Sequence, residues 1–419
     1  MSKSSLSVRR VRFDTGEVEP ALVDESGIPA VLPLRWVMRK RRLEAAVNTI
    51  EGDLRGVAEL YEWALSAPTL ADELRGRGRR PNLDEDLAAG RQLSPAELES
   101  LIDFVRGKSK NAARPRELRS PATIGNRLGS IKMFLEWAAN PFERGSTTNV
   151  ETGEIKAYKD RLAATIDPYR RGSASRRPDP LSSQEDEQLR TIVFPERGPG
   201  GRILMPLRFP ARNPFQASSR IRNWLIYLLM RDSGLRRSEV LCLMLDDLPR
   251  PGREYIEIRR RPNNPAETRN PAPQVKGMEG VIPVGPALKI ALRAYQAPRG
   301  TGRRKMGSPF LITSRNGDPL SFPGLDAIWD TVTKHLPDDF PPLSSHVLRH
   351  TWAEEVATDL IVNRKEPQEN ALAMLREAGR WSPGSDTPLH YIQNALRTGV
   401  NERIRQRQHA TYCGENTNT

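Results

Sequence analysis

The stretch Ser345-His346-Val347-Leu348-Arg349-His350-Thr351-Trp352-Ala353 decides how the rest of this 419-residue sequence is interpreted. His346, Arg349 and His350 are spaced three and four apart, so a helix would carry all three on one face. A histidine pair at this spacing can bind zinc, but an arginine between the imidazoles would repel a dication. The residue after the first histidine is Val347, not the glutamate of a zinc-protease helix. The segment therefore favours phosphate binding, and we expect neither a metal nor a cofactor.

Upstream lies Gly234-Leu235-Arg236-Arg237-Ser238-Glu239, which we call the first arginine segment; residues 345–353 are the second. The guanidinium group is planar, permanently charged and forked, so Arg236 and Arg349 could each bind a non-bridging phosphate oxygen. Charge builds on those oxygens as a fifth oxygen approaches phosphorus. By analogy with an oxyanion hole, each arginine would contribute about a hundredfold to a thousandfold in rate. Glu239, one helical turn after Arg236, would orient that arginine.

Tyr391, which follows Gly379-Arg380-Trp381-Ser382, is the candidate nucleophile. A phenol with a pKa near 10 is about 3 units from ionisation at neutral pH, so forming the phenolate costs about 4 kcal/mol. Neighbouring cations or a base such as His346 must offset that cost. A phosphotyrosyl ester would store the energy of the broken bond, so a strand could be rejoined without ATP. Core packing is the alternative role for this side chain, and Tyr412 in the polar tail is a second candidate.

The net charge favours a polyanionic partner. Lys and Arg number 65 against 52 Asp and Glu, which gives +13 and a pI near 10.0. Released counterions favour the binding of such a chain to a phosphate backbone. The basic residues also cluster, for example at Arg39-Lys40-Arg41-Arg42 and Arg259-Arg260-Arg261. Ribosomal RNA and anionic membranes would attract the same charge; together with the candidate phosphate-binding residues, the partner we expect is double-stranded DNA.

Other features of the composition bear on location. No apolar run approaches 18 residues, and the N-terminus is polar, so we expect no membrane span and no secretion. The two cysteines, Cys242 and Cys413, are too few for a disulfide framework. The expectation is a cytoplasmic, nucleoid-associated protein.

The N-terminal half contains three kinds of sequence. Residues 1–35 predict an extended arm or strand pair, because the alternating run 8–13 is followed by several prolines. Residues 36–140 carry apolar stripes at helical spacing and the helix-start residues Ser94 and Ser120. Residues 141–174 are rich in Gly, Pro, Ser and Thr and predict a linker.

In the C-terminal half, residues 175–396 are predicted to be mainly helical, and residues 397–419 are predicted to form a tail. Two short strands are expected at 254–258 and 280–284, on either side of a loop that contains Lys276. Helices are expected at 218–232, 236–245, 286–297, 322–336, 347–362, 370–379 and 387–396. The predicted fold class is mainly α with a small antiparallel β-sheet.

On these residues, the sequence resembles the tyrosine recombinases, the superfamily of phage integrases and chromosome-dimer resolvases. Residues 234–239 are similar to the first arginine box of that family, and residues 346–351 to the second. Tyr391 falls where the family places its nucleophile. The resemblance spans most of residues 40–395. It implies a helical core-binding domain at 36–140 and a catalytic domain at 175–396, which together form a C-shaped clamp on DNA.

The resemblance also implies roles for single residues. Arg236, Arg349, His346 and Trp381 would bind the scissile phosphate, with Glu239 and His350 in support. Lys276 would protonate the departing 5′ hydroxyl; its alternative role is that of a solvated loop lysine. Trp381 stands where the family more often has histidine. The spacing to Tyr391 is about one residue longer than usual, so Arg380 and His390 remain alternatives for that position.

The resemblance implies a site-specific recombinase that integrates or excises a mobile element through a 3′-phosphotyrosyl link at Tyr391. Strand exchange needs four active sites, so it implies a tetramer on DNA, with accessory proteins of the same element as further candidate partners. The tail 397–419 would dock on a neighbouring subunit. Two alternatives stay open: a type IB topoisomerase, and a non-catalytic DNA-binding accessory protein of a transposition system.

Overall fold

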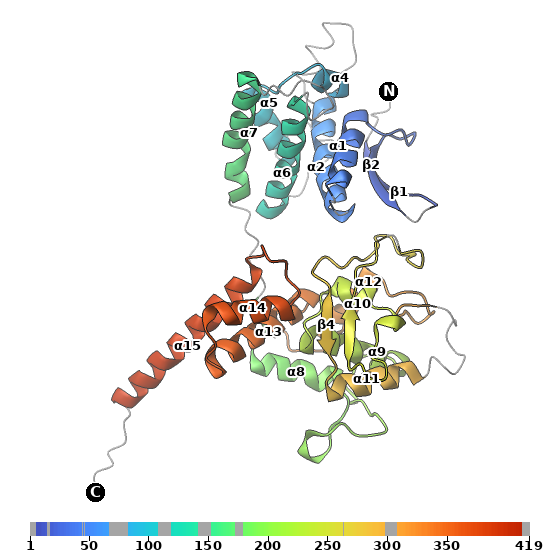
Figure 1. The fold of residues 1–419 in the computed structure, drawn as a ribbon, viewed down its shortest axis with the longest axis vertical. Coiled ribbons are helices and arrows are strands. Elements are labelled where there is room, and N and C mark those ends of the chain that lie inside the picture. The colour runs from blue at the N-terminus through green and yellow to red at the C-terminus, as the bar shows by residue number, and fades with distance from the viewer. Residues whose placement is uncertain are drawn as a thin grey trace. The chain divides into compact units, whose positions relative to one another are not determined.

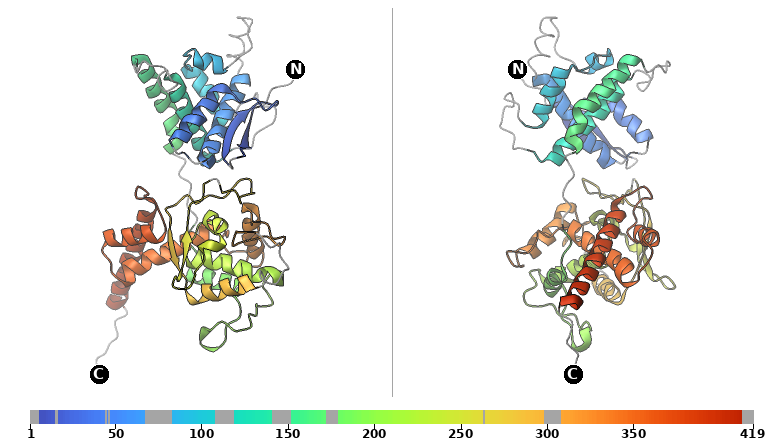
Figure 2. Two further views of the ribbon diagram at one scale, coloured as in Figure 1. Left: turned by 45° about the vertical axis from the view of Figure 1, so that its right-hand side comes forward. Right: turned by 90° about the vertical axis from the view of Figure 1, so that its left-hand side faces the viewer.

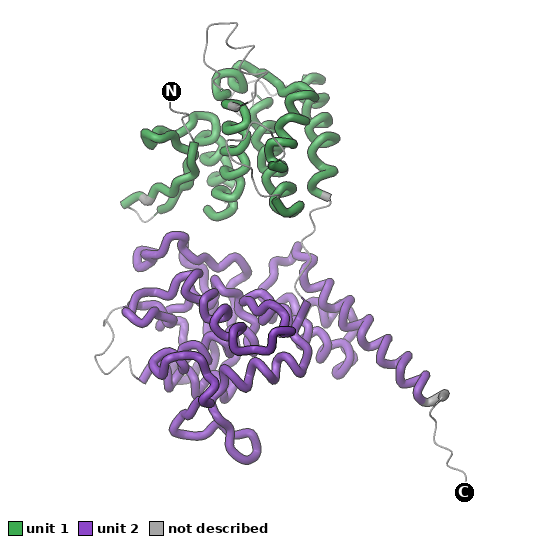
Figure 3. Tube along the Cα trace, turned by 180° about the vertical axis from the view of Figure 1, so that it is seen from behind, with its two compact units in different colours: residues 1–176 green, residues 177–419 purple. Residues whose placement is uncertain are grey.

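The fold is mainly helical and divides into two compact units, residues 1–176 and 177–419 (Figures 1 and 3). It is taken from a computed structural model, which describes residues 6–14, 17–43, 45, 47–66, 83–107, 119–140, 152–171, 179–262, 264–297 and 308–412. Within the described residues, two small antiparallel sheets accompany the helices. The predicted fold class is therefore confirmed.

Unit 1 is a helical bundle with a β-hairpin at its start. Its elements are β1 (Ser7–Arg12), β2 (Val18–Val23), α1 (Val31–Arg42), α2 (Val47–Ser66), α4 (Leu83–Ala88), α5 (Pro95–Val105), α6 (Pro121–Ala139) and α7 (Gly153–Arg171). The strands pair in antiparallel register from Ser7 opposite Val23 to Arg12 opposite Val18. Leu22 of β2 lies in the same buried core as Trp36 and Phe134. Strands β1 and β2 thus form a pair that packs on the unit 1 core.

The structure contains a helix inside the range 141–174, where the composition predicted a linker. Tyr158, Leu162 and Ile166 of α7 are buried in the unit 1 core, at successive intervals of four residues. Helix α7 packs along α6, as the views in Figure 2 show. The flanking Gly, Ser and Thr residues dominated the composition and concealed this apolar stripe. Residues 141–151 and 172–178 lie outside the described part of the chain.

Unit 2 carries the segments that contain the candidate site. Its elements are α8 (Ser183–Val193), η1 (Pro199–Gly201), α9 (Ala217–Tyr227), η2 (Leu228–Asp232), α10 (Arg237–Cys242), η3 (Leu245–Asp247), β3 (Tyr255–Ile258), β4 (Gly280–Pro283), α11 (Pro286–Gln296), α12 (Phe322–Thr333), α13 (Ser345–Thr358), η5 (Asp359–Asn363), α14 (Gln368–Ala378) and α15 (Thr387–Tyr412). Strands β3 and β4 pair antiparallel from Tyr255 opposite Pro283 to Ile258 opposite Gly280. The two expected strands are confirmed.

The predicted helix starts agree with the structure. The Ser94 side chain accepts a hydrogen bond from the backbone N–H of Glu97, and the Glu97 carboxylate accepts one from the N–H of Ser94. Ser182 and Glu185 make the same reciprocal pair at the start of α8. Each pair satisfies two backbone donors that the first turn of a helix leaves without partners.

A buried ionic network holds α13 against the elements that precede the first arginine segment. Arg231 of η2 donates two hydrogen bonds of 3.0 Å to the Asp186 carboxylate of α8 and one of 2.6 Å to Glu355 of α13. Tyr227 also donates to Asp186, at 3.0 Å. The forked contact fixes the buried Arg231 of η2 to α8, and the single bond to the exposed Glu355 links η2 to α13.

The basic clusters are partly neutralised inside the fold. In α1, Lys40 pairs with Asp53 at 2.7 Å, and Arg41 pairs with Glu19 at 2.7 Å. Beyond β3, Arg261 pairs with the buried Asp247 at 2.6 Å. These basic residues are therefore in part structural, which lowers the number available for a nucleic acid.

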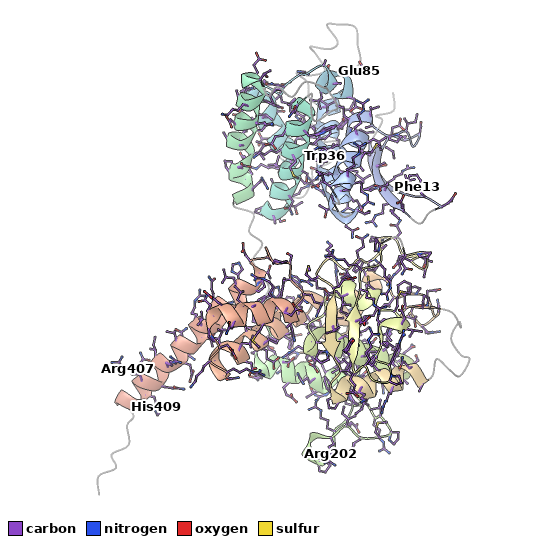
Figure 4. All side chains as sticks on the ribbon, in the orientation of Figure 1. Phe13, Trp36, Glu85, Arg202, Arg407 and His409 are labelled. Carbon is purple, nitrogen blue, oxygen red and sulfur yellow. The ribbon has the colours of Figure 1, made fainter. Side chains whose placement is uncertain are left out.

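Helix α15 continues well past residue 396, where the tail was expected to begin. Its outer half carries exposed side chains up to residue 409, with Arg407 and His409 labelled in Figure 4. Among them, Leu396, Val400 and Ile404 form an exposed apolar stripe at intervals of four residues. No helix in the described ranges is long and apolar enough to cross a membrane.

Candidate active site

The turn before α10 brings Arg236 to the site and requires glycine. Gly234 has a φ of 65°, and a Cβ atom there would overlap the ring of Trp352. The turn leaves Arg236 as the residue before the first residue of α10, with its backbone N–H donating to Glu239 Oε2 at 2.9 Å. The Arg236 side chain remains partly exposed, so the guanidinium can reach a ligand from solution.

Arg349 of α13 connects both halves of the site. Its side chain is buried, and its two terminal nitrogens donate to the carbonyl oxygen of Gly234 and, at 2.6 Å, to that of Gly379. The Trp381 ring centroid lies 4.5 Å from the guanidinium carbon. Arg236 donates to the same Gly379 carbonyl at 3.3 Å. The two arginines that lie far apart in the sequence therefore share one backbone acceptor.

Glu239 lies at the centre of three arginines. Its carboxylate, fully buried, accepts from Arg236 Nη1 at 2.6 Å and from Arg380 Nη2 at 3.1 Å, and lies 3.9 Å from Arg349 Nη1. Burial alone raises the pKa of Glu239, but Arg380, Arg349 and Arg236 outweigh it and lower the pKa below its ordinary value. The carboxylate is ionised and orients the guanidinium groups. We call these four residues the arginine cluster.

The arginine cluster has an excess of positive charge. Burial, followed by repulsion from Arg236, lowers the pKa of Arg349 to about 9, although Glu239 opposes the shift. Burial also lowers the pKa of Arg380. Three guanidinium groups against one carboxylate leave the site short of negative charge, and a bound phosphate would supply it.

The Tyr391 side chain, in α15, is buried in one cluster with Trp352 and Trp381. Its ring is 5% exposed, and its hydroxyl forms a hydrogen bond with Nδ1 of His350. The ring centroid of Trp381 is 6.0 Å from that of Tyr391, and Trp381 in turn stacks 6.2 Å from Trp352. Since Trp381 also lies on Arg349, the candidate nucleophile is one aromatic ring away from the arginine cluster.

The structure separates the two histidines of α13. His350 is buried beside Tyr391, whereas His346 is exposed, with its ring edge-on to His350 at 4.5 Å between centroids. Sequence reasoning named His346 as the base for Tyr391 and gave His350 a supporting role. Helical spacing puts both on one side of α13. Which of them meets the phenol depends on how α15 packs, and the sequence carries no direct signal of that.

Lys276 is exposed in the loop before β4, and the next residue fixes that loop to the arginine cluster. A Cβ atom on Gly277 would lie 2.5 Å from the carbonyl oxygen of Arg380 and 2.6 Å from Arg236 Nη1. Only glycine allows the main chain to approach this closely. The backbone of the lysine loop therefore touches the cluster, while the ammonium group extends from the surface.

A family comparison agrees with this geometry. Residues 210–362 match the phage integrase family, and the matched range contains Arg236, Lys276, His346 and Arg349. The chain contains a phage integrase family domain. The resemblance to the tyrosine recombinases is thereby confirmed. Trp381 and Tyr391 lie beyond the matched range.

Three solved structures of recombinases are similar to this chain. A XerH recombinase bound to palindromic difH substrate shares 16% identity over 88% of this chain and 83% of its own, with a TM-score of 0.49. A lambda integrase dimer bound to a COC′ core site shares 14% over 94% and 96%, with a TM-score of 0.40. XerA recombinase shares 14% over 89% and 97%, with a TM-score of 0.36. No curated protein sequence matches the chain.

Three residues beyond the matched range, Arg380, Trp381 and His390, were candidates for the position before the nucleophile. The Trp381 ring contacts Arg349 and Tyr391. The Arg380 guanidinium instead turns toward Glu239, and His390 is exposed on α15. Of the three, Trp381 has the contacts expected of a residue that borders the phosphate. The Tyr412 side chain lies outside the described part of the structure.

The structure gives no metal cluster in the ranges it describes: no group of three His, Cys, Asp or Glu side chains gathers there. The polar groups that converge on the site are guanidinium, carboxylate, imidazole and phenol. Guanidinium groups can bind a phosphodiester by charge and hydrogen bonding, and a phenol can attack one.

Proposed function

We propose that this protein is a tyrosine-type, site-specific DNA recombinase that cleaves and rejoins strands through a 3′-phosphotyrosyl link at Tyr391. The observation that carries the proposal is the placement of the buried Tyr391 hydroxyl against His350, with Trp381 between the phenol and Arg349. Any buried phenol needs a hydrogen-bond partner, but here the partner is an imidazole that could accept the phenolic proton. A guanidinium that could bind a phosphate lies beyond the next ring. The phage integrase family match supports the same function.

In the proposed reaction, Arg236 and Arg349 bind the non-bridging oxygens of the scissile phosphate. Tyr391 attacks phosphorus and forms a new P–O bond as the P–O5′ bond breaks. The phenolic proton passes to His350, the imidazole hydrogen-bonded to the hydroxyl. Lys276 donates a proton to the departing O5′. Rejoining reverses these steps with a 5′ hydroxyl from another strand, so no nucleotide cofactor is consumed.

The proposed partner is double-stranded DNA. The net charge of +13 and the arginine cluster support it. The helical core-binding domain at 36–140 and the catalytic domain at 175–396 would form the C-shaped clamp. His346, exposed beside His350, and Trp381 would line the phosphate with the arginines. The substrates would be the ends of a mobile element, with its accessory proteins as further partners, in the cytoplasm at the nucleoid.

Four active sites would assemble as a tetramer on two DNA sites. The exposed stripe Leu396, Val400 and Ile404 supports a role for the tail from residue 397 in docking on a neighbouring subunit, because it leaves an apolar helix face in solvent. A chain truncated at Arg397 would then cleave DNA but fail to form the paired complex. Native gel analysis of the two forms on a duplex that the full chain pairs would test this; pairing by the truncated form would contradict it.

The function can be tested with nicked suicide duplexes tiled across the DNA that flanks the gene. The recombinase should form an adduct that resists SDS on a subset of these duplexes, and Tyr391→Phe should bind the same DNA without forming it. DNA binding without an adduct on any duplex would instead indicate an accessory protein. Relaxation of supercoiled plasmid without site preference would indicate a topoisomerase.

A further inference from the structure

Arg380 has a backbone conformation that its residue type rarely adopts. It follows Gly379, the C-cap of α14, with a φ of 53°, and its side chain is only 3% exposed. An L-residue other than glycine is uncommon in this region. The helix end holds it there, because the N–H of Arg380 donates to the Glu377 carbonyl and that of Trp381 to the Arg376 carbonyl. The burial of a charged guanidinium at this position calls for a role.

The side chain of Arg380 is fixed by three acceptors. Nη2 donates to Glu239 Oε2 at 3.1 Å and to the Gly234 carbonyl at 3.4 Å, and Nη1 donates to the Ala378 carbonyl at 2.9 Å. Two of these acceptors belong to the first arginine segment. The guanidinium therefore links the chain after α14 to the turn that positions Arg236.

The main chain of Arg380 holds the lysine loop. Its carbonyl oxygen accepts from the backbone N–H of Met278 at 3.0 Å. A Cβ atom on Gly280 would lie 3.2 and 3.3 Å from Cγ and Cδ of Arg380, so the loop also rests on the arginine stem. From its other side, Arg260 donates to the Gly277 carbonyl at 2.8 Å and 3.1 Å.

We propose that Arg380 is a positioning residue that holds the Lys276 loop in register with the arginine cluster. Its guanidinium fixes the residue to Glu239, and its carbonyl, turned by the positive φ, fixes Met278. The Lys276 ammonium then lies close to O5′ when the phosphate is bound by Arg236 and Arg349. This inference rests on the proposed function, because it requires Lys276 to give a proton to O5′ as the P–O5′ bond breaks.

A sulfur substitution in the substrate separates this role from phosphate binding. With sulfur at the 5′ bridging position, the same attack breaks a P–S bond and releases a thiolate. A thiol, with a pKa near 8.5, is far more acidic than a hydroxyl, so the sulfur leaving group needs no proton donor. Losing a general acid should therefore matter on the oxygen substrate and little on the sulfur substrate.

The variants are Arg380→Ala, Arg380→Gly and Lys276→Ala, assayed by the rate of covalent adduct formation on both suicide substrates. Lys276→Ala should slow the oxygen reaction by about a hundredfold or more. Arg380→Ala, which only misplaces the lysine, should slow it by about tenfold to a hundredfold. Both variants should recover most of their loss on the sulfur substrate. The double variant should be no slower on oxygen than Lys276→Ala, since both act on one step. Arg380→Gly, which keeps the positive φ without strain, should lose less than Arg380→Ala.

Two controls bracket the result. Arg236→Ala should be slow on both substrates, and Arg364→Ala, an exposed arginine paired with Asp359, should match wild type on both. An Arg380→Ala loss that is equal on oxygen and sulfur, or absent from both, would overturn the proposal. Thermal unfolding shows whether this variant folds, and Arg380→Gly carries the comparison if it does not. Failure of the wild type to form an adduct on either substrate would instead overturn the proposed function.

Discussion

The hydroxyl of Tyr391 forms a hydrogen bond with Nδ1 of His350, so the candidate nucleophile of α15 meets the second arginine segment within its own chain. The same helix, α13, carries Arg349, which holds the carbonyls of Gly234 and Gly379. One helix therefore positions the phenol, a proton acceptor and a phosphate ligand together.

His350 should matter more to cleavage than His346. His350 is the proposed proton acceptor, so His350→Ala should slow adduct formation by about a hundredfold or more. His346→Ala, which changes an exposed ring, should cost less than His350→Ala. The measurement is the single-turnover rate on a suicide duplex, and a larger effect at His346 would contradict the assignment.

Glu239 should stabilise the fold as well as orient the arginines. Glu239→Gln leaves three arginines without their central carboxylate, and removing one partner of a buried ion pair costs about 3 kcal/mol or more. Denaturant unfolding at neutral pH measures this loss. A variant as stable as wild type would show that the cluster does not need the charge.

The same carboxylate predicts a pH dependence. The pKa of Glu239 is lower in the folded state than in the unfolded state, so its stabilising effect is present above the unfolded value and fades as the pH falls through the folded value. The stability difference between wild type and Glu239→Gln should therefore shrink below about pH 4. A difference that stays constant down to pH 2 to 3 would mean that ionisation of Glu239 contributes little.

Gly234 should be intolerant of substitution for two reasons that can be separated. Gly234→Ala places a Cβ atom on the Trp352 ring and forces alanine to a φ of 65°. Gly252→Ala shares the positive φ, at 80°, but meets no atom within 4 Å. The matched control should cost about 1 kcal/mol, and Gly234→Ala at least about 2 kcal/mol. Equal losses would show that the contact with Trp352 carries no penalty.

The excess positive charge of the arginine cluster should bind an inorganic anion. Sulfate at about ten times its Kd should stabilise the protein by about 1.4 kcal/mol, measured as a rise in Tm over chloride at equal ionic strength. Arg236→Ala should abolish most of that rise, because Arg236 is the cluster arginine open to solvent. A rise that the variant retains would place the anion elsewhere.

Local patterns allowed much of this site to be predicted. The arginine segments and the helices around them follow from spacing, capping residues and apolar periodicity, which act over a few residues. The position of His350 on Tyr391 depends on the packing of α15 against α13. The proposed role of Arg380 depends on its positive φ, which an arginine in a sequence does not predict. Helix α7 was missed because composition was averaged over a range in which a few apolar residues at helical spacing decide the structure.

The extension of α15 past residue 396 was also missed by sequence reasoning. Residues 397–409 are mostly polar or charged. The helical spacing of Leu396, Val400 and Ile404 is the main local signal of a helix there, and sequence reasoning did not use it. By contrast, β3 and β4 were predicted closely, because alternation and flanking turn residues are local signals.

The most direct test of the central claim is to locate the bond between protein and DNA. The adduct from a suicide duplex can be digested with protease and nuclease, and the peptide that retains a nucleotide identified by mass spectrometry. We predict a single modified residue, Tyr391, linked to the 3′ phosphate. A nucleotide on Tyr412 or on any serine, or an adduct that forms at full rate in Tyr391→Phe, would contradict the account.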